Sequence, residues 1–248
     1  MSAEKSAAIV LRVIEFSETS CVVTLMTREF GKITGLAKGA RRKKSPFEAA
    51  LDVLSIVRIV FLRKTPPAMD LLTESKLERR FRAASSDLER LYAAYYVAEL
   101  LTVMTEFADP QPSLFDVAET TITGLDEGLI SPFWLLSRFE LQMLEFLGHL
   151  PVLNACVSCE RIVPPNATKV HFGFLDGGVL CTNCRMGKTS VMSLKRESLD
   201  VLQSLSTVGF ESPAALPSGA VQAEVRQLLN QNINHLLGFR PRVQAYLK

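Results

Sequence analysis

Four of the five cysteines in this 248-residue chain fall into two Cys-x-x-Cys pairs. The first pair is Cys156 and Cys159, and the second, Cys181 and Cys184, follows after a gap of 21 residues. Each pair can present two thiolates from one tight turn, and two such turns can surround a zinc ion tetrahedrally. Four thiolates leave no open coordination position, which favours a structural zinc ion over zinc-dependent hydrolysis. The alternative is a set of redox-active or disulfide-linked dithiols, but one shared ion explains both pairs more simply.

A basic segment is the second feature with chemical consequences. The run Lys38-Gly39-Ala40-Arg41-Arg42-Lys43-Lys44 carries five cations in seven residues and follows a predicted strand. On a loop, such a run can neutralise several phosphates at once and release their counterions. An isolated run is more often a solvated loop that confers solubility, but a barrel of the kind predicted below commonly binds oligonucleotides through its loops. We therefore predict sequence-independent binding of the phosphate backbone. The predicted nucleic-acid-binding residues are Lys32, Lys38, Arg41, Arg42, Lys43 and Lys44.

No catalytic constellation accompanies these clusters in the sequence. The three histidines are scattered, and neither a Gly-x-Ser-x-Gly elbow nor an HExxH motif occurs. His171 is the only credible substitute for a cysteine ligand. Phe30 and Phe47 lie near predicted loops and could stack on unpaired bases, although core packing is the favoured role for each. The pattern indicates a binding protein, not an enzyme.

The elements that must position these residues change character near residue 80. Short runs rich in Val, Ile, Leu and Thr, separated by turn signals, predict strands over residues 7–14, 21–27, 33–37, 51–62 and 69–77. Five short strands in about eighty residues are typical of a small barrel such as the OB-fold.

Apolar residues then recur at helical spacing. The expected helices begin after an N-cap at Ser85 or Ser86, after Ser113, at Pro132, near Ser193 and near Ala220. The helix from Pro132 to Gly148 is apolar almost all round and should be largely buried. The sequence thus predicts an α+β protein: an N-terminal OB-fold β-barrel followed by a helical domain with an inserted zinc-ribbon-like motif. The predicted boundaries are 1–80 for the barrel, 81–248 for the helical domain and about 151–190 for the zinc-binding insertion.

Charge is distributed unevenly along the chain, although its formal net charge is only +2. Residues 1–80 hold 15 Lys/Arg against 9 Asp/Glu, residues 81–150 hold 3 against 11, and residues 151–248 hold 10 against 6. The first, basic segment is where a polyanionic partner is expected. The sequence contains neither a signal-peptide pattern nor an apolar run long enough to span a bilayer, which favours a cytoplasmic, nucleoid-associated protein with reduced thiols.

Several segments resemble the RecO family of bacterial recombination mediators. They are the Phe30–Ser45 segment with its Lys-Gly-Ala-Arg-Arg run, the His171–Cys181 hairpin and the Asn234–Arg242 ending, in addition to the barrel pattern and the cysteine pairs. The resemblance covers nearly the whole chain. One departure from a typical zinc knuckle is that Glu160 and Arg185, not glycine, follow the second cysteine of each pair.

The resemblance implies a function in DNA repair and homologous recombination without catalysis. It implies binding of single- and double-stranded DNA, annealing of complementary strands, and partnership with RecR and the single-stranded-DNA-binding protein to help RecA load onto coated DNA. The residues alone leave two alternatives open. One is a zinc-ribbon protein–protein adaptor without direct DNA binding; the other is a metal-dependent nuclease, for which no open carboxylate site stands out.

Overall fold

The computed structural model describes residues 3–42, 45–47, 50–65, 69–83, 87–207, 209, 211, 213 and 215–247. The fold is mixed α+β, with a β-sheet region at the N-terminus and a helical region after it. The chain divides into two compact units, the first containing Met1–Gly128 with Ala245–Lys248 and the second Leu129–Gln244. Within the described residues, no helix is long and apolar enough to cross a membrane. The domain boundary near residue 80 stays a prediction.

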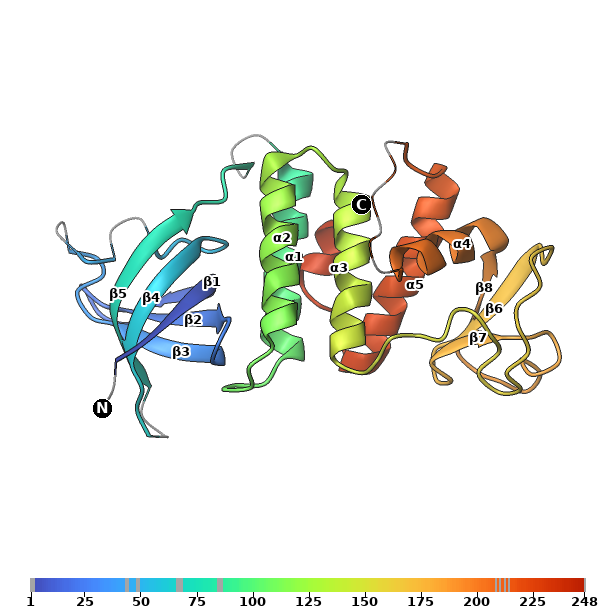
Figure 1. The fold of residues 1–248 in the computed structure, drawn as a ribbon, viewed down its shortest axis with the longest axis horizontal. Coiled ribbons are helices and arrows are strands. Elements are labelled where there is room, and N and C mark those ends of the chain that lie inside the picture. The colour runs from blue at the N-terminus through green and yellow to red at the C-terminus, as the bar shows by residue number, and fades with distance from the viewer. Residues whose placement is uncertain are drawn as a thin grey trace. The chain divides into compact units, whose positions relative to one another are not determined.

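A five-stranded closed barrel forms the core of the first unit (Figure 1). Its strands are β1 (Ala3–Glu15), β2 (Cys21–Thr27), β3 (Gly31–Ala37), β4 (Ile56–Leu62) and β5 (Asp70–Arg79). β1 pairs antiparallel with β2 on one side and with β4 on the other. β3 and β5 form a parallel pair, so the order β1-β2-β3-β5-β4 returns to β1.

Alternation of side chains builds the barrel interior. Cys21, Val23 and Leu25 occupy every second position of β2, and all three are buried in the same apolar cluster. Their partners come from the other strands and include Val57, Ile59 and Phe61 of β4. The period-two pattern that predicts the strands is therefore the pattern that fills the barrel.

The start of β4 differs from the prediction, which placed it at Leu51. Residues 51–55 form a turn instead, in which Leu54 has a φ of 71°. The Leu54 amide donates to the Val10 carbonyl at 2.9 Å, and the Ser55 amide donates to the Asp52 carbonyl at 3.0 Å. These bonds to a neighbouring strand and within the turn hold the chain out of the regular ladder until Ile56.

Two helices complete the first unit: α1 (Leu88–Met104) and α2 (Pro112–Glu127). The observed N-cap of α1 is Asp87, whose carboxylate accepts from the amides of Glu89 at 3.0 Å and Arg90 at 3.2 Å. The predicted caps Ser85 and Ser86 lie outside the described residues. Gly128 ends α2 in the left-handed conformation, with a φ of 71°.

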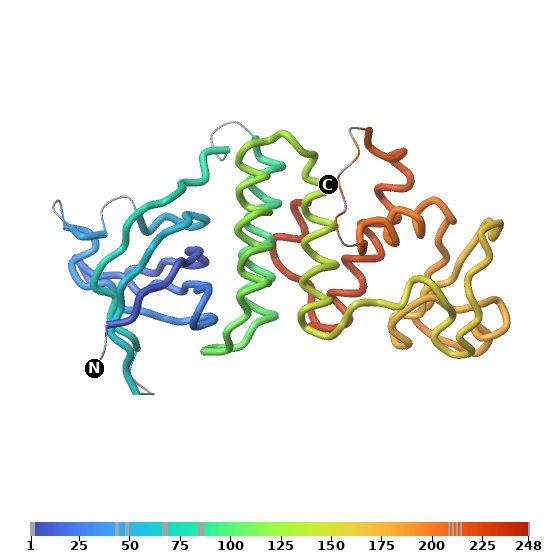
Figure 2. Tube along the Cα trace, viewed as in Figure 1, coloured from blue at the N-terminus to red at the C-terminus, as the bar shows by residue number. Residues whose placement is uncertain are grey.

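In its described residues, the second unit contains three α-helices and a small antiparallel sheet. The helices are α3 (Pro132–Phe146), α4 (Arg196–Leu205) and α5 (Gly219–Leu237). The strands β6 (Lys169–Gly173), β7 (Gly178–Leu180) and β8 (Val191–Lys195) pair in the order β7-β6-β8. Figure 2 shows this segment leaving the end of α3, passing through the short strands and returning to α4. The cysteine-bearing segment therefore interrupts a run of helices, as predicted.

A single apolar cluster joins the small sheet to the helices. It includes Phe172 of β6, Leu194 of β8, Leu199 of α4 and Val225 of α5, all 1% exposed or less. α3 contributes Trp134 to the same cluster. Because the cluster draws on both sheet and helices, the insertion is anchored in the core of the second unit.

A buried ion pair links α3 to α5 inside the second unit. Glu140 of α3 is fully buried, and Arg226 of α5 is 9% exposed. The Arg226 guanidinium donates to both oxygens of the Glu140 carboxylate, at 3.0 Å for the Nη2–Oε1 bond, and also to Asn230 Oδ1 at 3.2 Å. The paired geometry offsets the cost of burying two charges.

Candidate metal centre and nucleic-acid interface

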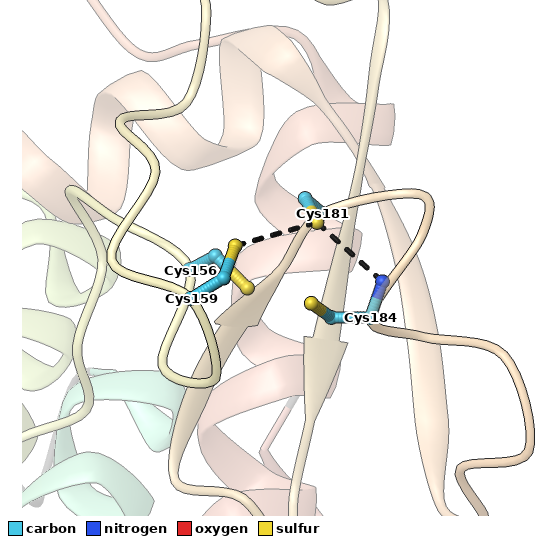
Figure 3. Close-up of side chains that lie close together, drawn as sticks. All are labelled: Cys156, Cys159, Cys181 and Cys184. Carbon is cyan, nitrogen blue, oxygen red and sulfur yellow. Dashed lines mark hydrogen bonds between the residues drawn. The ribbon is translucent and has the colours of Figure 1, made fainter.

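The four paired cysteines converge at one end of the small sheet (Figure 3). Their sulfur atoms all lie within 4.8 Å of one another, and Cys159 Sγ lies 3.8 Å from Cys181 Sγ. A tetrahedron with Zn–S bonds of about 2.3 Å has sulfur–sulfur edges of about 3.8 Å. A disulfide would bring two sulfurs to about 2.05 Å. The separations thus fit four ligands around one ion and do not fit a disulfide between the pairs.

Equivalent main-chain turns present the two pairs. In the first turn the Glu160 amide donates to the Cys156 carbonyl at 2.8 Å, and in the second the Arg185 amide donates to the Cys181 carbonyl at 3.0 Å. Glu160 adopts the left-handed conformation with a φ of 59°, where glycine is the ordinary residue. The absence of glycine after each second cysteine has therefore not changed the turn; in the first turn it is accommodated with backbone strain.

Gly178, at the start of β7, allows the first turn to lie against the hairpin. A Cβ atom at this position would lie 2.5 Å from the Val152 carbonyl oxygen and 2.7 Å from Cγ1 of Val157. The Val157 amide donates to the Val179 carbonyl at 3.0 Å across this contact. The close backbone approach brings the Cys156 turn next to β7, which leads directly into Cys181.

The cysteine thiols ionise unequally. Burial raises the pKa of Cys156, but amide donors from Cys181, Ser158 and Cys159 outweigh it and lower that pKa to about 6. The backbone amide of Cys184 lowers the pKa of Cys181, whereas hydrogen bonds to its neighbours raise the pKa of Cys184 to about 12. Neighbouring thiolates repel, so holding all four deprotonated requires a cation among them.

The other candidate ligand, His171, lies outside this group. Its Nδ1 atom lies 3.1 Å from the hydroxyl of Ser193, on the neighbouring strand β8. Burial lowers the pKa of the imidazole, and the positive charges of Arg185 and Lys169 lower it further. Among the described residues, the cysteines are the set placed to hold an ion.

The basic loop follows β3 directly. Lys38, Arg41 and Arg42 are exposed, whereas Lys43 and Lys44 lie outside the described residues. Arg41 forms an ion pair with Glu15 at 3.0 Å. In the part of the chain that the structure describes, neither Lys38 nor Arg42 forms an ion pair. These two neighbouring loop cations are therefore free to contact a phosphate.

Many other cations of the first unit are matched by carboxylates. The matched cations are Arg28 with Asp116, Arg58 with Glu78, Arg79 with Asp126 and Glu127, Arg80 with Asp52, and Arg90 with Asp87. The net positive charge of residues 1–80 thus overstates the charge available at the surface. Among the described cations without an ion pair, Lys38 and Arg42 lie together on the loop after β3, whereas Lys5, Arg12 and Lys76 lie on strands.

Lys32 corrects the predicted patch. Its side chain is buried at 4% exposure, and its ammonium donates to the carbonyls of Thr102 and Thr105, each at 2.5 Å. The ammonium also lies 4.7 Å from the centre of the Phe107 ring. These carbonyls belong to the end of α1, where a helix lacks internal donors and favours a cation. The prediction that Lys32 contacts DNA is wrong, because its charge stabilises a helix terminus.

The backbone around Lys32 completes this junction between barrel and helix. The Ala108 amide donates to the Lys32 carbonyl at 2.9 Å. Gly31 has a φ of 68°, and a Cβ atom there would lie 2.2 Å from the Asp109 carbonyl oxygen. Any larger residue at position 31 would push the chain after α1 away from β3.

The aromatic residues singled out from the sequence face inward, and another one faces out. Phe47 is 3% exposed in the barrel core, and Phe30 packs edge-on against Phe61 with ring centres 5.3 Å apart. Phe16, directly after β1, is 61% exposed. Sequence reasoning passed over Phe16 because an apolar residue next to a strand is ordinarily a core residue.

Comparison with known proteins identifies a family whose two regions match this chain. The family described as "Recombination protein O N terminal" matches residues 1–81, and "Recombination protein O C terminal" matches residues 85–244. The DNA repair protein RecO of Rhodopirellula baltica is 39% identical over 264 aligned residues, covering 97% of each chain. RecO of Anaeromyxobacter dehalogenans is 31% identical, covering all of this chain and 96% of that one. RecO of Myxococcus xanthus is 33% identical, with coverage of 94% and 92%.

Proposed function

Because this chain belongs to the RecO family of DNA repair proteins, we propose that it is a non-enzymatic mediator of DNA repair and homologous recombination. In this proposal it binds single- and double-stranded DNA without sequence preference, anneals complementary strands and, with RecR, helps RecA load onto DNA coated by single-stranded-DNA-binding protein. The observation that carries the proposal is the pair of unmatched cations on a loop of the N-terminal barrel.

The barrel supports the nucleic-acid role. Its strand order, β1-β2-β3-β5-β4 with closure onto β1, is the order we assign to an OB-fold. OB-folds bind oligonucleotides on a strand face and the adjoining loops. We propose Lys38, Arg41, Arg42, Lys43 and Lys44 as the DNA-contacting residues, and Lys32 is excluded from this set by its burial.

Annealing follows from contacts of this kind. Cations that grip phosphates without reading bases lower the repulsion between two strands and leave the base edges free to pair. Arg41 should contribute less to DNA affinity than Lys38 or Arg42, because a phosphate must compete with the Glu15 carboxylate for its guanidinium. No step in this mechanism requires a covalent intermediate or an open metal site.

The cysteine group is proposed as a structural zinc site. Cys156, Cys159, Cys181 and Cys184 supply thiolates, the ligands that zinc favours, and their spacing fits a tetrahedron. Bound zinc would supply cross-linking of the two turns and charge neutralisation. The chain's own contribution is to hold four sulfurs within 4.8 Å of one another around that position.

The salt dependence of single-strand affinity tests the DNA-binding proposal. Each phosphate contact contributes about −0.7 to the slope of log K against log salt concentration for single strands. Replacing both Lys38 and Arg42 with alanine should therefore reduce the magnitude of that slope by about 1.4. The matched control replaces Arg12 and Lys76 with alanine, which removes one arginine and one lysine from exposed positions of β1 and β5. An equal change in both double variants would refute the location of the contacts.

One observation favours the adaptor alternative. A cavity of about 320 Å³ lies beside the cysteines, with apolar walls that include Ile162 and Pro164 and with Arg161, Lys169 and His171 around it. Ile162 is 75% exposed. A partner protein with an acidic, apolar segment would suit such a cavity. Under the adaptor alternative, single-strand affinity is weak and nearly independent of salt in the same titration.

A further inference from the structure

A cavity of about 410 Å³ lies between the turn after β1 and the start of the basic loop. Phe16 and Ser20 line it from the turn, Leu36 from β3, and Lys38 and Arg42 from the loop. Small-ligand cavities commonly measure roughly 300–1,000 Å³. Among the described residues that line this cavity, none is acidic. The cavity thus combines an aromatic ring, an aliphatic wall and two cations.

Phe16 is the aromatic ring that lines this cavity. It is 61% exposed, and it makes no ring contact with another described aromatic residue. Its backbone is nevertheless fixed, because the Phe16 amide donates to the Ser20 carbonyl at 3.0 Å and the Ser17 amide donates to the same carbonyl at 3.1 Å. An exposed ring on a fixed backbone can accept a flat partner with little loss of conformational entropy.

The two cations are held beside this ring by the main chain. The Arg41 amide donates to the Thr19 carbonyl at 3.1 Å, and the Gly39 amide donates to the Ser20 hydroxyl at 3.4 Å. These bonds tie the basic loop to the turn that carries Phe16. Gly39 has a φ of 73°, and the space where its Cβ would stand faces the Arg42 side chain at 3.5 Å. The loop therefore turns back so that Arg42 lines the cavity together with Lys38.

We propose that this cavity holds one unpaired nucleotide of single-stranded DNA, with its base stacked on Phe16 and the flanking phosphates bound by Lys38 and Arg42. Stacking platforms next to backbone-binding cations are how proteins hold single strands without reading sequence. The inference rests on the proposed DNA-binding function and adds a preference that cations alone do not give. A duplex offers phosphates to the loop, but its bases are stacked on one another and cannot reach the ring.

The test compares Phe16 variants of the full chain on oligothymidine and on a duplex of the same length. Phe16→Ala should weaken single-strand affinity by about 5-fold to about 150-fold, the range of one lost stack. Duplex affinity and the salt slope should not change, since no charge is removed. Phe16→Tyr should keep single-strand affinity, whereas Phe16→Leu should behave like alanine. The control is Phe239→Ala, the same substitution at a ring that is 51% exposed in the second unit.

A fluorescent variant gives a direct readout of stacking. The chain has one tryptophan, Trp134, which is 5% exposed in the second unit. Phe16→Trp therefore adds an exposed indole above a constant background, and its emission should be quenched by oligothymidine and not by the duplex. An abasic oligonucleotide should bind the wild type as weakly as oligothymidine binds Phe16→Ala.

The outcomes separate the two proposals. Unchanged single-strand affinity in Phe16→Ala, or equal losses on single strand and duplex, would overturn the stacking site and leave salt-dependent DNA binding in place. Quenching of the tryptophan variant by duplex and single strand alike would overturn it as well. A wild-type protein that binds neither DNA would overturn the stacking site together with the proposed function.

Discussion

Replacing Lys32 with methionine should destabilise the first unit and leave DNA binding unchanged. The substitution keeps most of the length of the side chain but leaves the carbonyls of Thr102 and Thr105 without their donor. Two hydrogen bonds from a charged donor are worth about 3–6 kcal/mol in total. Part of this is recovered because the ammonium is no longer desolvated, the effect that lowers the pKa of Lys32. A net loss of about 2 kcal/mol is expected.

Urea unfolding followed by circular dichroism measures this loss, with Lys76→Met as the control. Lys76 is exposed on β5, so its replacement should change the free energy of unfolding by less than about 0.5 kcal/mol. A Lys32 variant as stable as the control would refute the capping of α1. A reduced salt slope for DNA binding in the Lys32 variant would revive a surface role for this residue.

The pH dependence supplies a second readout with a definite sign. Burial lowers the pKa of Lys32 below 10.5, so the unfolded chain binds more protons than the folded chain between the two values. Stability attributable to Lys32 therefore rises as pH increases through the lowered pKa toward 10.5. The stability difference between wild type and Lys32→Met should grow in this window. A difference that shrinks with rising pH would contradict the assignment.

Three further predictions concern the second unit. Cys181→Ser removes one ligand of the proposed zinc site. It should lower the metal content of the purified protein and destabilise this unit by more than about 3 kcal/mol, as followed by metal analysis and thermal melting, while single-strand affinity stays within about twofold. Loss of DNA binding in a stable variant would show that the cysteine site serves DNA binding before folding. Glu160→Gly should stabilise the unit by about 0.5–1 kcal/mol, because glycine adopts the positive φ of this position without strain. A lower free energy of unfolding in denaturant for this variant would count against backbone strain at residue 160. Arg226→Met should lower the free energy of unfolding by about 3–5 kcal/mol in a urea titration, because it leaves the Glu140 carboxylate buried and unpaired. Adding Glu140→Leu should recover most of this stability. No recovery in the double variant would show that the unpaired charge is not the cause of the loss.

Local patterns carried most of what could be predicted from the sequence. Strands and helix ends depend on side-chain period, caps and glycine, so the range of β2 and the start of α2 could be predicted closely. The cysteine pairs were recognisable because the two cysteines of each pair are close in sequence, so each pair already fixes two of the four ligands of a zinc site. The family resemblance that these segments indicated is confirmed by the matches to both RecO regions.

What the sequence did not reveal depends on contacts between distant residues. Lys32 is buried because α1 ends against it, 70 and 73 residues further along the chain. The exposure of Phe16 depends on where the turn after β1 meets the loop after β3. Ion pairs that neutralise other cations likewise join residues such as Arg28 and Asp116, which are 88 positions apart. Composition counts paired and unpaired cations equally, and only the structure distinguishes them.

Annealing of complementary oligonucleotides coated with single-stranded-DNA-binding protein tests the central claim most directly. The wild-type protein should accelerate duplex formation above the rate of the coated strands alone. Reversal of the loop charges, Lys38→Glu with Arg42→Glu, should remove the acceleration, and Cys181→Ser should retain it at a temperature where that variant is folded. Coated strands that anneal no faster with the wild-type protein than without it would contradict the proposed mediator function.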